Sequence, residues 1–201
     1  MRGTLCEIPE KAKTIKALAC IGVTIMIYVI RHGQTDLNKE GRLQGRKGLP
    51  LNEVGKTQAI QLKDVFSGIK FDYVFSSPQE RAVQTAEIIT GLNVEVDSRL
   101  DVFDLGEADG LKRSEVQLKG IIPDPNLYKG VEDVRSFINR VFDFMEGLKK
   151  KLNSKEAGVL ISGHRCTTGC VGAFFNGLPE DGNILRYSSG NGEYKIYTLK
   201  G

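Results

Sequence analysis

The sequence contains two histidines, and each lies directly after a short apolar stretch that has the composition of a buried strand. These residues are His32 and His164. A third apolar stretch, residues 71–76, leads into a helical pattern that carries Arg81 near its start. The carboxyl ends of parallel strands meet at one edge of an open sheet. We therefore expect both histidines and Arg81 to share one site.

Arginines and histidines with few acids around them are suited to binding and transferring a phosphoryl group. Arg31 directly precedes His32, so the expected site holds two guanidinium groups, which fit phosphate oxygens in bidentate geometry. A neutral imidazole can attack phosphorus, while a second imidazolium and the arginines stabilise charge on the transferring oxygens. The residue types therefore predict phosphoryl transfer through a phosphohistidine, without a cofactor or a metal ion.

Strand-like and helix-like segments alternate along the chain, which predicts an α/β fold. The pattern predicts strands at 24–30, 71–76, 93–96 and 159–162, and helices at 53–66, 78–90, 131–152 and 167–177. Ser77 is predicted to cap the second helix, with Pro78 in its first turn and Gly91 after its end. The segment 100–110 is expected to be a loop, and residues 184–187 and 194–199 are expected to pair as an antiparallel hairpin.

The composition is that of an ordinary globular domain. The chain has 201 residues, of which 40% are hydrophobic and 26% charged, and these values exclude a disordered, collagen-like or coiled-coil protein. A net charge of +3 is too small for a polybasic surface, so no nucleic acid partner is expected. Four cysteines do not form the dense pattern of a secreted disulfide scaffold, which favours a cytoplasmic location.

The N-terminal region superficially imitates a signal peptide, because lysines precede an apolar run at residues 17–30. This run of 14 residues is shorter than the ~20 that a membrane-spanning helix needs, and it leads straight into His32. We expect no membrane partner. We interpret residues 1–25 as an extension and residues 26–201 as the domain.

Four blocks of residues resemble a known family when their order and spacing are taken together. They are Arg31-His32-Gly33-Gln34-Thr35 with Asn38; Gln44-Gly45 with Pro50-Leu51 and Gly55; Ser76-Ser77-Pro78 with Arg81-Ala82 and Gln84-Thr85-Ala86; and Ser162-Gly163-His164. This set resembles the histidine phosphatases, also called the phosphoglycerate mutase-like superfamily. The resemblance implies a three-layer α/β/α sandwich with a mostly parallel central sheet.

The resemblance also implies roles for individual residues. His32 would be the nucleophile, and Arg31, Arg81 and His164 would hold the phosphoryl group. Further substrate contacts would come from Asn38, Gln44 and Gly45. Hydrogen bonds that stabilise the loop are the alternative role for Asn38 and Gln44.

One position departs from the family pattern. Members of the family carry a general acid in a Leu-x-Glu step, and here Leu100 is followed by Val102 at the acid position. Valine cannot transfer a proton, and a missing acid costs on the order of 10²–10⁴-fold for a poor leaving group. The candidate substitutes are Asp101, Asp104, Glu107 and Asp109, of which we favour Asp104 and Glu107 equally.

The residues after His164 are also unusual for the family, because Arg165 and Cys166 stand where small, glycine-led residues are expected. Arg165 would either add a charge to the substrate pocket or point to solvent. Cys166 and Cys170 have no second cysteine pair with which to complete a zinc site, so we expect their side chains to take part in helix packing and not in redox chemistry.

We therefore expect a metal-independent phosphomonoester hydrolase that acts on a small phosphorylated metabolite or a phosphoprotein. Two alternatives remain. One is a phosphoglycerate mutase-type phosphotransferase, although the segment 110–131 is short for the insert that caps the site in such enzymes. The other is a phosphate-binding module with weakened catalysis, because of Val102.

Overall fold

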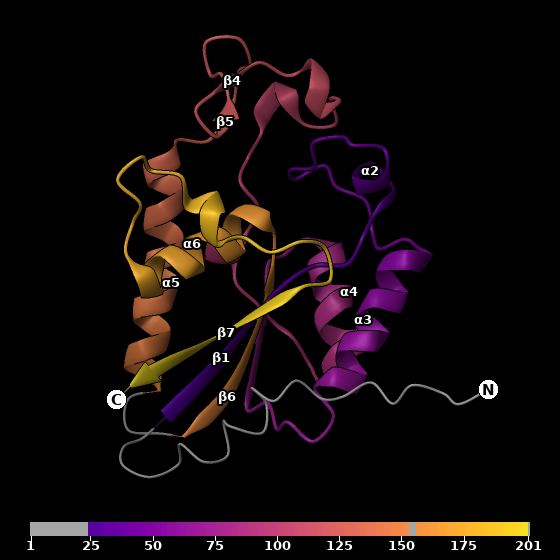
Figure 1. Ribbon diagram of the computed structural model, residues 1–201, viewed down its shortest axis with the longest axis vertical. Coiled ribbons are helices and arrows are strands. Elements are labelled where there is room, and N and C mark those ends of the chain that lie inside the picture. Colours follow the sequence, from indigo (N-terminus) through magenta and orange to yellow (C-terminus); the bar gives the residue numbers. More distant parts are fainter. Residues whose placement is uncertain (1–23, 153–155, 201) are drawn as a thin grey trace, which may run out of the picture.

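A computed structural model describes residues 24–152 and 156–200, and a five-stranded sheet forms its centre (Figure 1). The strands are β1 (Thr24–Arg31), β2 (Tyr73–Ser76), β3 (Glu95–Val96), β6 (Ala157–Gly163) and β7 (Tyr194–Lys200), in the spatial order β3-β2-β6-β1-β7. Only β7 runs antiparallel to its neighbour. Most of the expected extension, residues 1–23, lies outside the described residues.

Two pairs of helices cover the two faces of the sheet. Helices α3 (Glu53–Val65) and α4 (Glu80–Thr90) lie on one face, and α5 (Val134–Lys151) and α6 (Arg165–Asn176) lie on the other (Figure 1). The expected three-layer α/β/α sandwich with a mostly parallel sheet is thus confirmed. No helix within residues 24–152 and 156–200 is long and apolar enough to cross a membrane.

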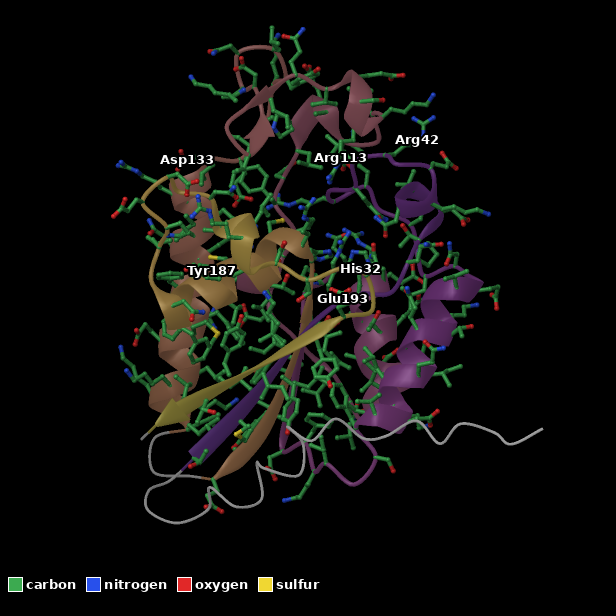
Figure 2. All side chains as sticks on the ribbon, viewed as in Figure 1. His32, Arg42, Arg113, Asp133, Tyr187 and Glu193 are labelled. Carbon is green, nitrogen blue, oxygen red and sulfur yellow. The ribbon has the colours of Figure 1, made fainter. Side chains whose placement is uncertain are left out.

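A cap segment, residues 105–131, lies over the carboxyl ends of the strands (Figure 1). It contains two single-turn 3₁₀ helices, Gly106–Ala108 and Arg113–Glu115, and a short antiparallel pair, β4 (Leu118–Lys119) and β5 (Ile122–Pro123). Figure 2 shows Arg113 on this segment above His32, which lies at the end of β1. Nearby loops carry α2 (Asp36–Lys39) and the 3₁₀ helix Ser98–Leu100.

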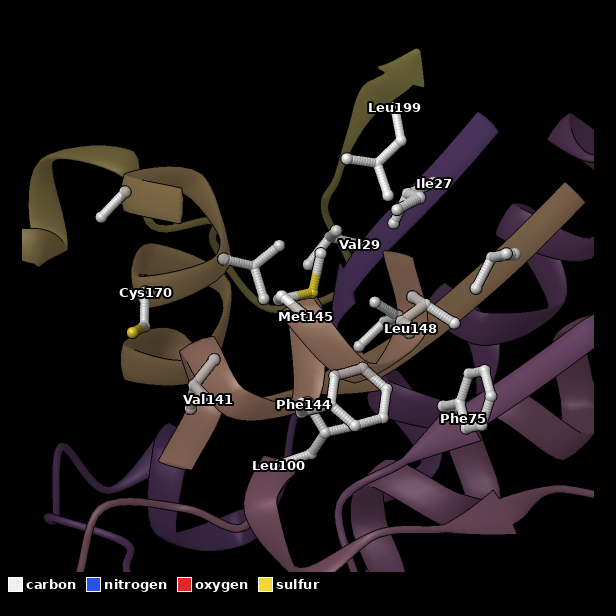
Figure 3. Packing of buried hydrophobic residues seen from close by; sticks show 14 of the residues in the cluster. Ile27, Val29, Phe75, Leu100, Val141, Phe144, Met145, Leu148, Cys170 and Leu199 are labelled. Atoms are coloured by element: carbon white, nitrogen blue, oxygen red, sulfur yellow. The ribbon is translucent and has the colours of Figure 1, made fainter. Parts of the chain in front are cut away.

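The alternating side chains of β1 explain why two layers of helices are needed. Ile25, Ile27 and Val29 pack into the larger cluster with α5 and α6, part of which Figure 3 shows. Tyr28 and Ile30 point to the opposite face and pack with α3 and α4. A strand that is buried on both sides has an almost continuous run of apolar residues, as this one does.

Local capping explains where several helices begin and end. The Asn52 side chain accepts a hydrogen bond from the Gly55 backbone N–H at 2.9 Å, so α3 begins at Glu53 as predicted. Asp133 caps α5 in the same way. Gly91 ends α4 in the left-handed conformation with φ of 65°, which glycine adopts without a steric cost.

The predicted start of α4 was wrong. Helix α4 begins at Glu80 with Gln79 as its N-cap, and Gln79 makes no side-chain capping bond. Ser77 lies before the helix, where its hydroxyl contacts His164 and Asp101. Ser77 Oγ also accepts the Gln79 backbone N–H at 3.2 Å, so its bond to the backbone is made at the N-cap residue and not inside the helix.

The predicted C-terminal hairpin was also wrong. Residues Ile184–Tyr187 form a 3₁₀ helix that packs against α6, with Ile184 buried in the core. Strand β7 pairs with β1 instead, and Val29 lies opposite Lys195. The open edge of β1 offers a complete ladder of backbone partners, which a short segment next in sequence cannot match.

Candidate active site

The two histidines lie at the ends of adjacent parallel strands. Arg31 of β1 lies opposite Gly163 of β6, and the His32 backbone N–H donates to the Gly163 carbonyl at 2.9 Å. The two imidazole rings are 5.1 Å apart between centroids. This separation is close to the spacing of neighbouring strands, about 4.8 Å. Strand pairing therefore brings the two histidines together.

His32 is arranged as a nucleophile. Its Nδ1 lies 2.7 Å from the Gly33 carbonyl oxygen, which can only accept, so Nδ1 carries the proton and Nε2 is unprotonated. The Nε2 lone pair accepts a long hydrogen bond of 3.3 Å from Arg81 Nε–H, which an incoming phosphoryl group would have to displace. Burial lowers the pKa of His32 well below its usual value, and the charges of Arg81 and Arg31 lower it further. The imidazole is therefore neutral at pH 7, and its nitrogen can attack an electrophile.

Arg81 lies beside His32 and is 1% exposed. Its Nε is 3.3 Å from His32 Nε2, and its Nη2 donates to the Gly45 carbonyl at 3.0 Å. Burial lowers the pKa of Arg81 to about 10, so the guanidinium remains charged at neutral pH. Within the described residues Arg81 forms no ion pair, which leaves its charge available to a ligand.

His164 is oriented by a short chain of hydrogen bonds. Its Nε2 is 2.8 Å from Ser77 Oγ, and the Ser77 hydroxyl donates to Asp101 Oδ1 at 3.3 Å. Because that hydroxyl donates to the carboxylate, Nε2 of His164 carries the proton. The other ring nitrogen, Nδ1, is buried without a partner, as is Nε of Arg31. Such orphaned buried groups are uncommon and mark a place for a polar ligand.

The histidines and Arg31 line a cavity of about 500 Å³ beneath the cap segment. Burial lowers the pKa of Arg31 to about 10, and its Nη1 donates to the Ser189 carbonyl at 3.3 Å. Among the described residues that line this cavity there is no aspartate or glutamate. Arg81 is not part of this lining and lies behind His32 Nε2. The arrangement can hold a dianion beside a neutral imidazole, with Arg31 in the cavity wall and Arg81 in contact with that imidazole.

Of the four residues predicted to contact the substrate, three line the cavity and one does not. Asn38 and Gln44 both line the cavity, and both also hold their loop, because each accepts a hydrogen bond from Thr35. Gly45 does not line the cavity but presents its carbonyl to Arg81. Arg165, whose position the sequence left open, lines the cavity.

The candidate acids do not point freely into the site. Arg46 bridges Asp101 and Asp104, with Nε and Nη1 at 3.2 and 3.0 Å from their carboxylates. Glu107 is exposed, lies outside the cavity lining, and accepts the Lys129 backbone N–H. Asp109 accepts the backbone N–H groups of Gly45 and Lys47 and so fixes their loop. Val102 itself is buried.

Several residues of the site were not indicated by the sequence pattern. Ser77 belongs to a block that resembles the family and was predicted only as a helix cap; its contact with His164 is what the pattern did not indicate. Asn191 donates to the His32 carbonyl from a loop that was expected to be a hairpin turn. Arg113 reaches the cavity from the cap segment without a local motif. Cys170 is packed in the core and Cys166 against it, as predicted. No three His, Cys, Asp or Glu side chains in the described part of the chain are grouped so that they could hold a metal ion.

Comparisons with known proteins agree with this geometry. A probable phosphoglycerate mutase, GpmB of Cronobacter sakazakii, is 29% identical over 176 residues that cover 77% of this chain and 76% of that protein. An uncharacterized phosphatase, PhoE of Bacillus subtilis, is 30% identical over 142 residues, with 69% and 70% covered. A mycobacterial glucosyl-3-phosphoglycerate phosphatase, solved as a complex with VO3, superimposes with a TM-score of 0.71 at 27% identity, with 85% and 91% covered.

The family profile described as the histidine phosphatase superfamily, branch 1, matches residues 27–200, which is nearly the whole domain. The resemblance seen in the sequence is thereby confirmed, and the chain belongs to the histidine phosphatase superfamily.

Proposed function

We propose that this protein is a metal-independent phosphomonoester hydrolase that works through a covalent phosphohistidine on His32. The observation that carries this proposal is a buried neutral His32 whose unprotonated Nε2 accepts a hydrogen bond of 3.3 Å from Arg81 Nε, in a site where nitrogens of Arg31 and His164 are buried without partners. Two guanidinium groups and a second imidazole can bind three phosphoryl oxygens around the point of attack. Named phosphatases among its relatives support the proposal.

In the first step, the lone pair of His32 Nε2 forms a bond to phosphorus as the ester P–O bond breaks. The leaving oxygen keeps that electron pair, departs as an anion and is then protonated by solvent water. The Gly33 carbonyl, 2.7 Å from Nδ1, stabilises the positive charge on the phosphorylated ring. In the second step, water attacks phosphorus and releases a proton to solvent, the P–N bond breaks, and the electron pair of that bond returns to Nε2. Burial, and then the charges of Arg81, His32 and Arg31, lower the pKa of His164; a bound dianion opposes the repulsion from the arginines and so favours protonation of Nδ1.

The absence of a carboxylate from the described cavity lining bears on the leaving group. Without a positioned acid, the leaving oxygen departs as an anion, so the reaction depends strongly on the acidity of its conjugate acid. We propose activated substrates, such as aryl or acyl phosphates, over simple alkyl esters. Asp104 and Glu107 remain the two candidates for a contributing acid, and each carboxylate is engaged outside the cavity lining, by Arg46 and by the Lys129 backbone N–H respectively.

The cavity of about 500 Å³ fits a small phosphorylated metabolite better than a folded phosphoprotein. The free thiols Cys166 and Cys170 suit a reducing compartment, and we propose the cytoplasm. A mutase remains the second candidate, because a relative is named a probable phosphoglycerate mutase and the cap segment forms part of the cavity wall. A bound product shielded from water could take the phosphoryl group back.

The test is hydrolysis of p-nitrophenyl phosphate in excess chelator, with trapping of an acid-labile, base-stable phosphoenzyme. We expect chelator-resistant turnover and a trapped phosphohistidine, both lost in His32→Ala. Arg99→Gln is the matched control, since Arg99 is ion-paired with Asp97 and Asp143 away from the cavity. Turnover that survives His32→Ala would overturn the mechanism. Phosphoenzyme without release of phosphate to water would favour the mutase, and binding without either would favour the weakened module.

The leaving-group proposal has its own test. Alkyl phosphates should be hydrolysed at least ~10²-fold more slowly than p-nitrophenyl phosphate, in terms of kcat/KM. Val102→Glu introduces a carboxyl at the family's acid position and should narrow this gap. Equal rates for both ester types in the wild-type protein would show that an acid does act, and loss of the alkyl activity in Asp104→Asn would identify it.

A further inference from the structure

The cavity wall is rich in arginine beyond what one phosphoryl group needs. Five arginines line it: Arg31, Arg42, Arg113, Arg165 and Arg186. Two of them are already neutralised by acids outside the cavity. Arg42 pairs with Glu40 at 2.8 Å, and Arg186 pairs with Asp181 at 2.7 Å.

Arg113 and Arg165 differ from these two. Within residues 24–152 and 156–200 neither forms an ion pair, and the Arg165 guanidinium has only a long contact of 3.5 Å with Ser188 Oγ. Arg165 is the first residue of α6, directly after His164, and Arg113 lies on the cap segment above His32 (Figure 2). The two side chains therefore approach the same cavity from its floor and from its roof.

The three unpaired cations of the cavity are close enough to repel one another. The charge of Arg165 lowers the pKa of both Arg31 and Arg113, in each case second to burial. A phosphoryl group held by Arg31, Arg81 and the histidines neutralises one end of this group. It leaves Arg113 and Arg165 in the same cavity wall without a counter-ion among the described residues. Repulsion between like charges costs stability unless a bound anion offsets it.

We propose that Arg113 and Arg165 form a second anion-binding subsite, which selects substrates that carry a carboxylate or a second phosphate besides the phosphoryl group transferred. This inference rests on the proposed function, because it takes the transferred group to lie at His32.

The apolar part of the cavity wall restricts the chemistry of the substrate between its two anionic groups. Leu105, Ile121, Pro123 and Leu185 line the cavity, and all four also line an adjoining apolar cavity of about 50 Å³. A short carbon skeleton can lie against these side chains, whereas a ring bearing many hydroxyl groups would leave them unsatisfied. The substrate class is thus a compact molecule with an anion at each end and carbon between them.

The test compares three series of ligands of two to four carbons: n-alkyl phosphates, phosphorylated ω-hydroxy acids, and bisphosphates of α,ω-diols. Their Kd values are measured by titration calorimetry with the His32→Ala variant, which needs no turnover. Failure of the hydrolase mechanism therefore does not mask the result. At fixed ionic strength, at least one of the two series that carry a second anionic group, the phosphorylated acids or the bisphosphates, should bind about tenfold to a hundredfold more tightly than the alkyl phosphate of equal length. Tighter acids identify a carboxylate subsite, and tighter bisphosphates identify a phosphate subsite.

Substitution of Arg113 and Arg165 then tests whether these two arginines cause the tighter binding of ligands with a second anionic group. Arg165→Gln and Arg113→Gln should each reduce it by about tenfold, whereas Arg186→Gln should retain most of it, because that arginine is already paired. Thermal unfolding of each variant checks that it is folded. Equal binding by all three series, or a preference that survives the Arg113→Gln and Arg165→Gln double substitution, would overturn the proposal.

Discussion

Gly48 gives a test of the site in which no charge is changed. A Cβ at this position would lie 1.8 Å from Nη1 and 2.7 Å from Cζ of Arg81. Non-bonded heavy atoms settle about 3.5 Å apart, so in Gly48→Ala the guanidinium must retreat by roughly 1–2 Å. The obstacle is the end of a flexible side chain, so the fold should survive while Arg81 moves. Its contacts with Gly45 and His32, at 3.0 and 3.3 Å, would then be lost.

The expected effect is large for a single methyl group. A misplacement of about 1 Å costs on the order of 10²-fold in rate, and a lost charge-assisted hydrogen bond weakens binding by roughly 10- to 100-fold. We expect kcat/KM for p-nitrophenyl phosphate and the affinity for vanadate or inorganic phosphate to fall accordingly. Gly147→Ala is the matched control, because the nearest atom to its added Cβ is 3.6 Å away on Arg99.

A double-mutant cycle tests whether the effect of Gly48→Ala comes from the displacement of Arg81. If Gly48 acts through Arg81, Gly48→Ala should have little further effect in an Arg81→Ala background. Two outcomes would contradict this account of the site. One is wild-type affinity in Gly48→Ala, and the other is an equal loss with and without Arg81.

Four further predictions follow from the same geometry. Arg81→Ala should weaken inhibition by inorganic phosphate by about 2–5 kcal/mol, the range for truncating a buried charge pair, and unchanged inhibition would exclude it as a ligand. Asp109→Ala should raise KM, because its carboxylate fixes the Gly45–Lys47 backbone at 2.7 and 2.9 Å; steady-state kinetics that match the wild type would refute this. Gly55→Ala should lower the unfolding temperature, since its Cβ would lie 2.1 Å from the Gln34 carbonyl, and an unchanged melting curve would be incompatible with that contact. His32 and His164 have pKa values in the folded protein below the usual 6.5, so between the folded and unfolded pKa values the unfolded chain binds more protons. The free energy of unfolding should therefore fall as pH drops from about 6.5, by roughly 1 kcal/mol per pH unit for each histidine. Urea titrations in which the His32→Ala variant shows the same dependence of unfolding free energy on pH as the wild type would contradict this.

The centre of the site could be predicted because its signals are local. Strands β1 and β6 are apolar on both faces, and each histidine follows its strand directly. The rule that ligands bind at the carboxyl ends of parallel strands then places His32 near His164. Arg165 could be singled out because it stands where the family has small, glycine-led residues, directly after His164 in the chain.

The errors arose where distant parts of the chain compete. Ser77 has the pattern of a helix cap, but its hydroxyl is used by His164 and Asp101, which lie 87 and 24 residues away. Strand β7 was assigned to a neighbour in sequence, although the free edge of β1 offered a longer ladder. Pairing between strands depends on which edges remain open, and this information is not local.

The surroundings of the missing acid show the same limit. Spacing along an extended segment favoured Asp104, but it could not reveal that Arg46 bridges Asp101 and Asp104 from another loop. Arg113 likewise enters the cavity only because the cap segment folds over the sheet. No periodicity or motif within its own segment marks it.

The position of the two histidines on paired central strands has a consequence for local unfolding. Seven residue pairs join β1 to β6, and the His32 backbone is part of that ladder. Amides in such a ladder exchange with solvent only when the whole domain opens, whereas short turns and small strand pairs open at lower free energy. The cap segment is built from such pieces. On warming, the protein should therefore lose its discrimination between substrates before it loses its chemistry, because the wall of the cavity opens while the nucleophile remains in place.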